Sequence, residues 1–135
     1  MDMGKGDNRA LQVGETTGAL KRLAKEFNVP VIVLSQLNRD LEKRDDKRPR
    51  MADLRDSGAI EQDADIVLFL YRDVVYDADT EHPNVAELIV AKQRNGALGT
   101  VFLQWHGSHM AFSNGQRPDG WSPVRRKPKP IARNL

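Results

Sequence analysis

Two cations, Lys92 and Arg94, stand directly before an Asn95-Gly96 dipeptide. Residues rich in apolar side chains flank them, over Val85–Ala91 and Leu98–Trp105. Asn-Gly between two such runs is the strongest short-range signal for a hairpin with a two-residue turn. Two cations on the tip of a rigid ribbon are suited to contacting phosphate, although a solvated hairpin tip is the commoner meaning of such a pattern.

The two-residue turn also predicts the register of the hairpin. It pairs Arg94 with Ala97, Lys92 with Gly99, Val90 with Val101 and Leu88 with Leu103. Because side chains alternate along a strand, both cations then share one face with these apolar residues.

A second set of polar side chains follows the apolar run Val31–Leu34. Residues from about Thr16 to Phe27 have helical periodicity, and Asn28 and Pro30 predict the end of that helix. A strand that is apolar on both faces is typical of a buried parallel sheet. In such sheets functional residues follow the carboxyl ends of strands, which here is the segment 35–39.

The remaining elements predict an α/β fold with two buried, parallel strands and an antiparallel β-meander. Asp65–Tyr71 is the second buried strand, and a strand at His109–Phe112 completes the meander. Asp40–Met51, dense in charge, is expected to be a mobile loop, and Ala52–Gln62 to form two short helical pieces around a loop.

Composition restricts the class of protein. The 135 residues are 39% hydrophobic and 30% charged, with no cysteine. The lack of cysteine excludes disulfides and thiolate chemistry and suits a cytoplasmic protein. No apolar run approaches a membrane span, and no apolar leader begins the sequence. Positive charge is concentrated after residue 114, in a segment expected to be disordered.

Several catalytic motifs are missing from the sequence. The phosphate-binding pattern G-x-x-x-x-G-K-[ST] does not occur, and Asp73 stands too far beyond its strand to be a magnesium ligand. His106 and His109 lack a third metal ligand by spacing, so no metal site is predicted. No serine has a G-x-S-x-G context. We therefore expect that this chain alone neither binds nor hydrolyses a nucleotide.

Four segments together resemble one family. They are NVPVIVLSQLNRDLEKRDDKRP, ADLRDSGAIEQDADIVLFLYRD, VAELIVAKQRNGALGTVFLQW and HMAFSN. Their order and spacing resemble the C-terminal part of the RecA-like (P-loop NTPase) motor domain of DnaB-type replicative DNA helicases. The resemblance covers roughly residues 8–114 and lacks the Walker A and Walker B segments. The resemblance implies a partial motor domain at 14–114. Composition predicts a flexible start at 1–13 and a basic tail at 115–135.

The resemblance assigns roles to residues of the first two segments. Gln36 matches the family's γ-phosphate sensor, and Arg39 is a weaker candidate in the same loop. Arg55, Asp56 and Gly58 match the loop that grips single-stranded DNA, where a glycine lets backbone N–H groups approach a phosphate. Glu61, with the two residues after it, is expected to couple that loop to Gln36.

In the third segment, Lys92 and Arg94 match the family's basic finger, which reaches the γ-phosphate bound by a neighbouring subunit. The resemblance therefore implies a homo-hexameric helicase that uses ATP and Mg²⁺ to move on single-stranded DNA. The alternative is a non-catalytic module that binds single-stranded DNA or caps a helicase ring. Either way, a partial sheet exposes strand edges, which predicts self-association or protection by other segments.

Overall fold

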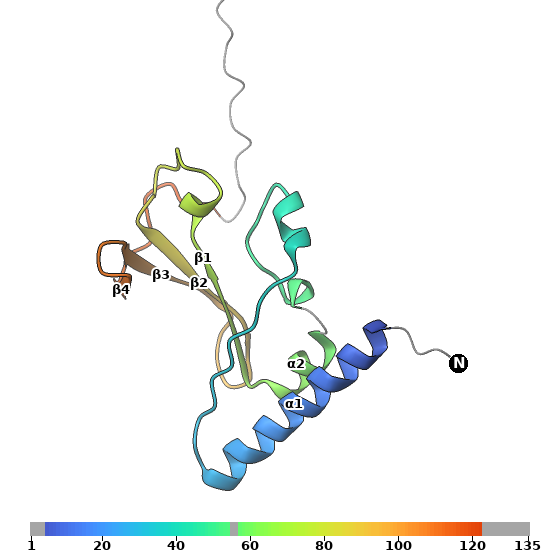
Figure 1. Cartoon of the computed structure of the whole chain (residues 1–135). Helices are drawn as coiled ribbons and strands as arrows, with labels where there is room; N and C mark the ends of the chain where they lie inside the picture. Colours follow the sequence, from blue (N-terminus) through green and yellow to red (C-terminus); the bar gives the residue numbers. More distant parts are fainter. Residues whose placement is uncertain (1–4, 55–56, 123–135) are drawn as a thin grey trace, which may run out of the picture.

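The structure is a computed structural model that describes residues 5–54 and 57–122. These ranges hold two α-helices, three short 3-10 helices and one four-stranded sheet (Figure 1). The strand order is β1-β2-β3-β4, and every neighbouring pair is antiparallel. The α/β class is thus confirmed. The expected pair of parallel strands is wrong for the described part of the chain, where all strand pairing lies within the meander.

Helix α1, Lys5–Phe27, begins eleven positions before the expected Thr16, so the flexible start predicted at 1–13 is helical from Lys5 onward. Gly14, a poor helix former, lies where α1 packs on α2, and a Cβ there would stand 3.5 Å from that of Ala59. The predicted end is confirmed. Asn28 adopts a left-handed φ of 50°, and the Val29 N–H donates to the Ala24 carbonyl at 3.1 Å.

The segment Val31–Leu34 is extended, but it is not the buried strand that the sequence predicts. Ile32 is 87% exposed and Leu34 is 95% exposed. No strand within residues 5–54 and 57–122 pairs with it. A strand is stabilised by hydrogen bonds to neighbours on its edges and by layers on its faces. The residue pattern shows a preference for burial, and the described chain supplies nothing to bury it.

Strand β1, Ile66–Tyr71, lies at an edge of the sheet and pairs with β2 alone. Val67, Phe69 and Tyr71 are buried, whereas the alternate residues are about half exposed. The expectation of burial on both faces is therefore wrong for this strand. The small core joins Leu54 to the covered face of β1, and its other members are Val67, Phe69, Leu37, Met51, Ile60, Ala64, Ile89 and Ala91.

The hairpin joins β2, Val85–Gln93, to β3, Gly99–His106, through a loop longer than the two residues predicted. Val90 pairs with Gly99 and Leu88 with Val101, which is a shift of two residues from the predicted register. A shift of two leaves these side chains on the predicted face.

The cation Lys92 does not follow them. An irregularity in the pairing of β1 with β2 sets it opposite the buried Val67. A bulge of this kind redirects the side chains beyond it. Lys92 therefore lies on the covered face, whereas the sequence predicts it on the face of Leu88 and Val90.

Strand β4, Ala111–Asn114, begins two residues later than predicted, because His109 belongs to the preceding turn. Residues 115–122 return to the sheet instead of forming the expected disordered tail. The Gly115 N–H donates to the Phe102 carbonyl at 3.2 Å, and the ring of Trp121 meets Phe102 edge-on with centroids 5.0 Å apart. The rest of the predicted tail, residues 123–135, lies outside the described residues.

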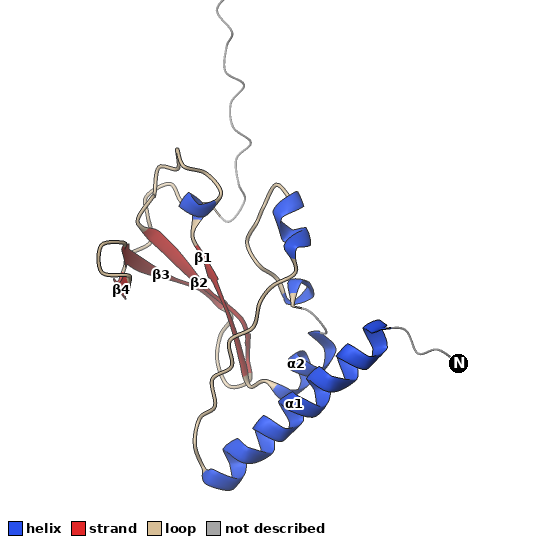
Figure 2. Ribbon diagram, viewed as in Figure 1, coloured by secondary structure: helices blue, strands red, loops and turns tan. Residues whose placement is uncertain are grey.

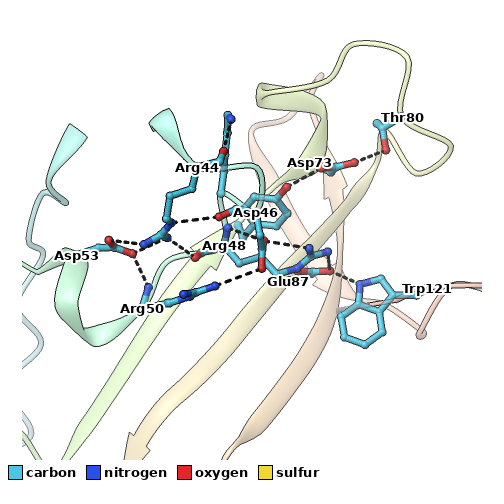
Figure 3. Close-up of polar contacts among 11 residues, drawn as sticks. Arg44, Asp46, Arg48, Arg50, Asp53, Asp73, Thr80, Glu87 and Trp121 are labelled. Atoms are coloured by element: carbon cyan, nitrogen blue, oxygen red, sulfur yellow. Dashed lines mark hydrogen bonds and ion pairs between the residues drawn. The ribbon is translucent and has the colours of Figure 1, made fainter. Parts of the chain in front are cut away.

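The charged segment 40–51, expected to be mobile, is tied down by ion pairs (Figure 3). It overlaps the 3-10 helix Arg39–Lys43 and leads into a second one, Met51–Asp53. Arg44 donates two hydrogen bonds to the buried Asp53 carboxylate, at 2.8 and 2.9 Å. Arg48 donates two to Glu87 on β2, at 2.6 and 2.9 Å.

The helical pieces predicted within Ala52–Gln62 correspond to the second of these 3-10 helices and to α2, Ser57–Asp63. Figure 2 shows α2 between α1 and the start of β1. Of the helices in the described ranges, none has the length and apolar character needed to cross a membrane.

Candidate functional site

The two cations singled out in the sequence, Lys92 and Arg94, meet the C-terminal end of α2. The Lys92 ammonium donates to the Glu61 carbonyl, and Arg94 Nη2 donates to the Gln62 carbonyl at 3.0 Å. The last carbonyls of a helix have no partner within it and carry its negative partial charge. Both cations therefore stabilise α2, and through Glu61 the structure brings together three residues of the predicted site.

A carboxylate completes this cluster. Asp65 Oδ1 lies 3.3 Å from Arg94 Nε and 2.6 Å from the Nζ of Lys21 on α1. The hydrogen bond from Lys21 lowers the pKa of Asp65 below its ordinary value, and the charges of Lys21, Arg94 and Lys92 lower it further. Lys21 also donates to the Asp63 carbonyl at 3.1 Å, so one lysine joins α1 to the start of β1.

The cluster borders an open hollow of about 490 Å³. The hollow lies between the end of α1, the start of the extended segment and the base of β1. Its charged lining residues are Lys21, Lys25, Asp65 and Arg94, and the others are Ala24, Asn28, Val29 and Pro30. Three cations against one carboxylate make the hollow suited to an anion.

Gln36 is exposed at the end of the extended segment. Within the described residues, no hydrogen bond or ion pair joins its side chain to Lys92 or Arg94. The next residue, Leu37, forms an isolated antiparallel bridge with Leu54. Arg39, also exposed, begins the 3-10 helix that Asn38 caps through its side chain.

The predicted DNA-binding residues fall at the border of what is described. Arg55 and Asp56 lie outside the described residues. Gly58 is exposed in the first turn of α2, and a Cβ there would meet nothing within 4 Å. Nothing in the described residues therefore requires a glycine at position 58 for steric reasons, and close approach by another molecule would account for it.

The comparisons with known proteins place the chain in a family. Residues 1–114 match the DnaB-like helicase C terminal domain. The chain belongs to this family. It is 56% identical over 108 residues to the replicative DNA helicase DnaB of Haemophilus influenzae, covering 80% of this chain and 23% of that protein. It is also 56% identical over 111 residues to the replicative DNA helicase DnaC of Bacillus subtilis, covering 82% and 24%.

A solved DnaB-like replicative helicase, described with its primase interactions, superposes with a TM-score of 0.78 at 46% identity. The match covers 86% of this chain and 28% of that chain. The chain thus spans about a quarter of the length of the DnaB relatives it matches. The resemblance read from the four sequence segments is confirmed at the level of the family. The roles of individual residues stay predictions.

Glu61, the residue expected to couple the DNA-binding loop to Gln36, accepts a hydrogen bond from Lys92 through its backbone carbonyl. Leu37, directly after Gln36, forms its bridge with Leu54, the last described residue before the predicted DNA-binding loop. The coupling role of Glu61 stays a prediction.

Sequence reasoning missed Lys21 and Asp65, whose pairing joins residues far apart in the chain and leaves no local signal. It also missed the ion pair of Arg48 with Glu87, although a signal existed. Glu87 interrupts an apolar strand, and a buried carboxylate requires a cation beside it.

His106, the last residue of β3, and His109, in the turn before β4, each contact a serine. His106 Nε2 lies 2.7 Å from Ser113 Oγ, and His109 Nδ1 lies 2.7 Å from Ser108 Oγ. Among residues 5–54 and 57–122, no three potential metal-ligating side chains gather.

Proposed function

We propose that this chain forms part of a hexameric replicative DNA helicase that couples ATP hydrolysis to movement on single-stranded DNA and to unwinding of the duplex. One observation carries the proposal: the cations Lys92 and Arg94 hold one end of α2, and the predicted DNA loop joins its other end. Membership of the DnaB-like family supports the same assignment.

In this proposal Lys92 and Arg94 act on a nucleotide held by the neighbouring subunit. They neutralise charge that develops on the γ-phosphate during phosphoryl transfer. The sequence contains no P-loop, so the nucleotide and its Mg²⁺ would be held by residues that this sequence does not supply. Both cations form hydrogen bonds to backbone carbonyls and remain partly exposed, which suits groups that must reach another molecule.

Gln36 and the DNA loop complete the proposal. Gln36 would sense the γ-phosphate through its neutral amide, with Arg39 nearby. Arg55, Asp56 and Gly58 would contact the DNA backbone. The bridge of Leu37 with Leu54 supports a link between them, because it lies one residue after Gln36 and one residue before Arg55.

A chimera tests this proposal. The matched region of the Bacillus subtilis relative is replaced by residues 1–114 of this chain, and ATP hydrolysis is measured with single-stranded DNA present. Arg94→Ala should lower kcat by about 10³-fold or more, the range for arginine fingers acting in trans. The control Arg22→Ala changes an exposed arginine of α1. A chimera whose hydrolysis survives Arg94→Ala would contradict the proposal.

The isolated chain gives a second test. We expect it to hydrolyse no ATP above background, because it lacks a P-loop of its own. If the purified chain hydrolyses ATP and Arg94→Ala abolishes that activity, the expectation that the chain is inactive without a P-loop would be wrong.

One observation favours the alternative of a ring-capping module. Ile32 and Leu34 are exposed on an extended segment that another chain could cover. Under this alternative, the chain would co-sediment with a full-length DnaB-type helicase and lower its activity, and Ile32→Asp would abolish both effects. Salt-dependent binding of single-stranded DNA by the chain alone would support the related DNA-binding module.

A further inference from the structure

Arg94 is held by a carboxylate that no motif singled out. Asp65 Oδ1 lies 3.3 Å from Arg94 Nε, and both side chains are more than half exposed. On its other side the same oxygen accepts a hydrogen bond from Lys21 at 2.6 Å. Asp65 therefore faces Lys21 on α1 and Arg94 beyond β2, with Lys92 adding its field from the same strand.

The contacts of Arg94 are of a kind that can be exchanged. Its side chain makes one hydrogen bond to the Gln62 carbonyl and one long ion pair to Asp65. Its backbone N–H donates to the Asp65 carbonyl at 3.1 Å, so the main chain is fixed here and only the side chain is free to exchange partners. Arginines that fix a structure typically form two parallel bonds to one carboxylate, as Arg48 does with Glu87. An incoming anion at the hollow beside Arg94 would compete with one solvated carboxylate contact and one hydrogen bond to a backbone carbonyl.

We propose that Asp65 is a positioning residue that holds Arg94 against α2 in competition with phosphate, and that Lys21 keeps Asp65 in place. Arg94 leaves Asp65 when it contacts phosphate and returns when the phosphate departs. The inference rests on the proposed function in taking phosphate as the competing anion. It adds that the finger has a defined resting partner within its own chain.

The position of Asp65 explains the role proposed for Lys21. The Lys21 ammonium donates to both the Asp63 carbonyl and the Asp65 carboxylate, which fixes the short segment between α2 and β1. Without Lys21, Asp65 could follow Arg94 toward the phosphate. With Lys21 present, the carboxylate stays behind and Arg94 moves alone.

The test uses the full chain and inorganic tripolyphosphate as the probe. NMR follows the Nε–H resonance of Arg94, identified by its loss in Arg94→Lys. Asp65→Asn should tighten the apparent Kd at Arg94 about two- to fivefold, the range expected on removing one exposed ion pair. Asp40→Asn is the matched control, because it removes an equal charge from an exposed carboxylate that pairs with Lys43.

A second measurement needs no phosphate. In the unliganded chain, Asp65→Asn should shift the Arg94 Nε–H resonance toward that of a solvated guanidinium, while Asp40→Asn leaves it unchanged. As the pH falls and Asp65 is protonated, sulfate should bind Arg94 more tightly. This increase should be smaller in Asp65→Asn than in Asp40→Asn.

The outcomes separate the two proposals. If Asp65→Asn binds tripolyphosphate no better than Asp40→Asn, or if neither binds at Arg94, the positioning role of Asp65 is wrong. That result would leave the finger role open to the chimera experiment. If Asp65→Asn tightens binding but Arg94→Ala leaves the chimera active, the role of Asp65 stands and the finger role fails.

Discussion

Two arginines of this molecule are held in opposite ways. Arg48 forms two hydrogen bonds to Glu87 and lies between the rings of Tyr71 and Trp121, with its guanidinium carbon 4.8 and 5.7 Å from their centroids. Arg94 is 51% exposed and holds one carbonyl and one carboxylate through single contacts. The difference separates a cation that fixes the fold from one that is able to leave its partners.

Solvent accounts for this difference. Glu87 is 4% exposed, so water cannot replace Arg48 as its partner. Burial alone would lower the pKa of Arg48, but the hydrogen bond and charge of Glu87, together with the charges of Tyr71 and Asp46, outweigh this and raise it. Around Arg94, water is available to both charges of the pair, and their attraction is correspondingly weak.

The largest expected effect comes from breaking the fixed pair. Arg48→Ala leaves the Glu87 carboxylate buried without its cation, and we expect the free energy of unfolding to fall by about 3–5 kcal/mol. Urea denaturation followed by circular dichroism measures it. Arg94→Ala serves as the control, with an expected loss below about 1 kcal/mol. Equal losses for the two variants would contradict the comparison.

The next effect concerns the aromatic cover of the fixed pair. Trp121 donates its indole N–H to Glu87 and packs edge-on against Phe102. Trp121→Ala should lower the free energy of unfolding by about 1–3 kcal/mol. The lost packing is smaller than for a fully buried tryptophan, because Trp121 is only half buried, and the lost hydrogen bond adds to it. Arg117→Ala, which removes only a cation 5.0 Å from the Trp121 ring, should have little effect in the same denaturation experiment.

A smaller effect, with two opposite signs, is expected at the end of α2 that faces away from the cations. Gly58→Ala should stabilise the chain by up to about 1 kcal/mol, because alanine favours the helix and a Cβ meets no neighbour. If DNA backbone approaches this position, the same change should weaken binding of single-stranded DNA. Thermal unfolding and fluorescence anisotropy measure the two effects. Stronger DNA binding would contradict the assignment of the loop.

The smallest effect is a titration at the releasable pair. The pKa of Asp65 is lowered in the folded chain, so its stabilising contribution is present at neutral pH and is lost as pH falls through that lowered pKa. Lys21→Ala should raise the pKa of Asp65 toward its ordinary value, and Arg94→Ala should raise it less, since the hydrogen bond from Lys21 is the main cause. Carbon-detected NMR of the carboxylate gives both values. A larger rise with Arg94→Ala would reverse the order proposed.

Local patterns predicted much of the fold and the order of its elements. The Asn28 cap, the strand at 66–71 and the hairpin strands depend on neighbours in sequence, and periodicity or turn chemistry reveals them. The hairpin register was missed because the turn is longer than Asn95-Gly96. The face on which Lys92 lies was missed because of the irregularity in the pairing of β1 with β2. The prediction of a buried strand at Val31–Leu34 was wrong, because a run of apolar residues indicates a preference for burial but does not provide a neighbouring strand to pair with.

The candidate site was predicted only in part, because local sequence does not show which distant residues come together. Motif resemblance identified Lys92 and Arg94, but it carried no information on Lys21 and Asp65, which meet only after α1 packs on α2. Glu87 shows what composition could have indicated, because a carboxylate within an apolar strand implies a cation arriving from elsewhere.

The order of the sheet has a consequence for how the chain acquires its structure. Each strand of β1-β2-β3-β4 pairs with its neighbour in sequence, so the meander has a low contact order and should form early and quickly. The pairs Arg48–Glu87 and Lys21–Asp65 close loops of about 40 residues and should form after it. During synthesis, α1 and the charged segment 40–51 would thus dock only after the strands that follow them in the chain have been made.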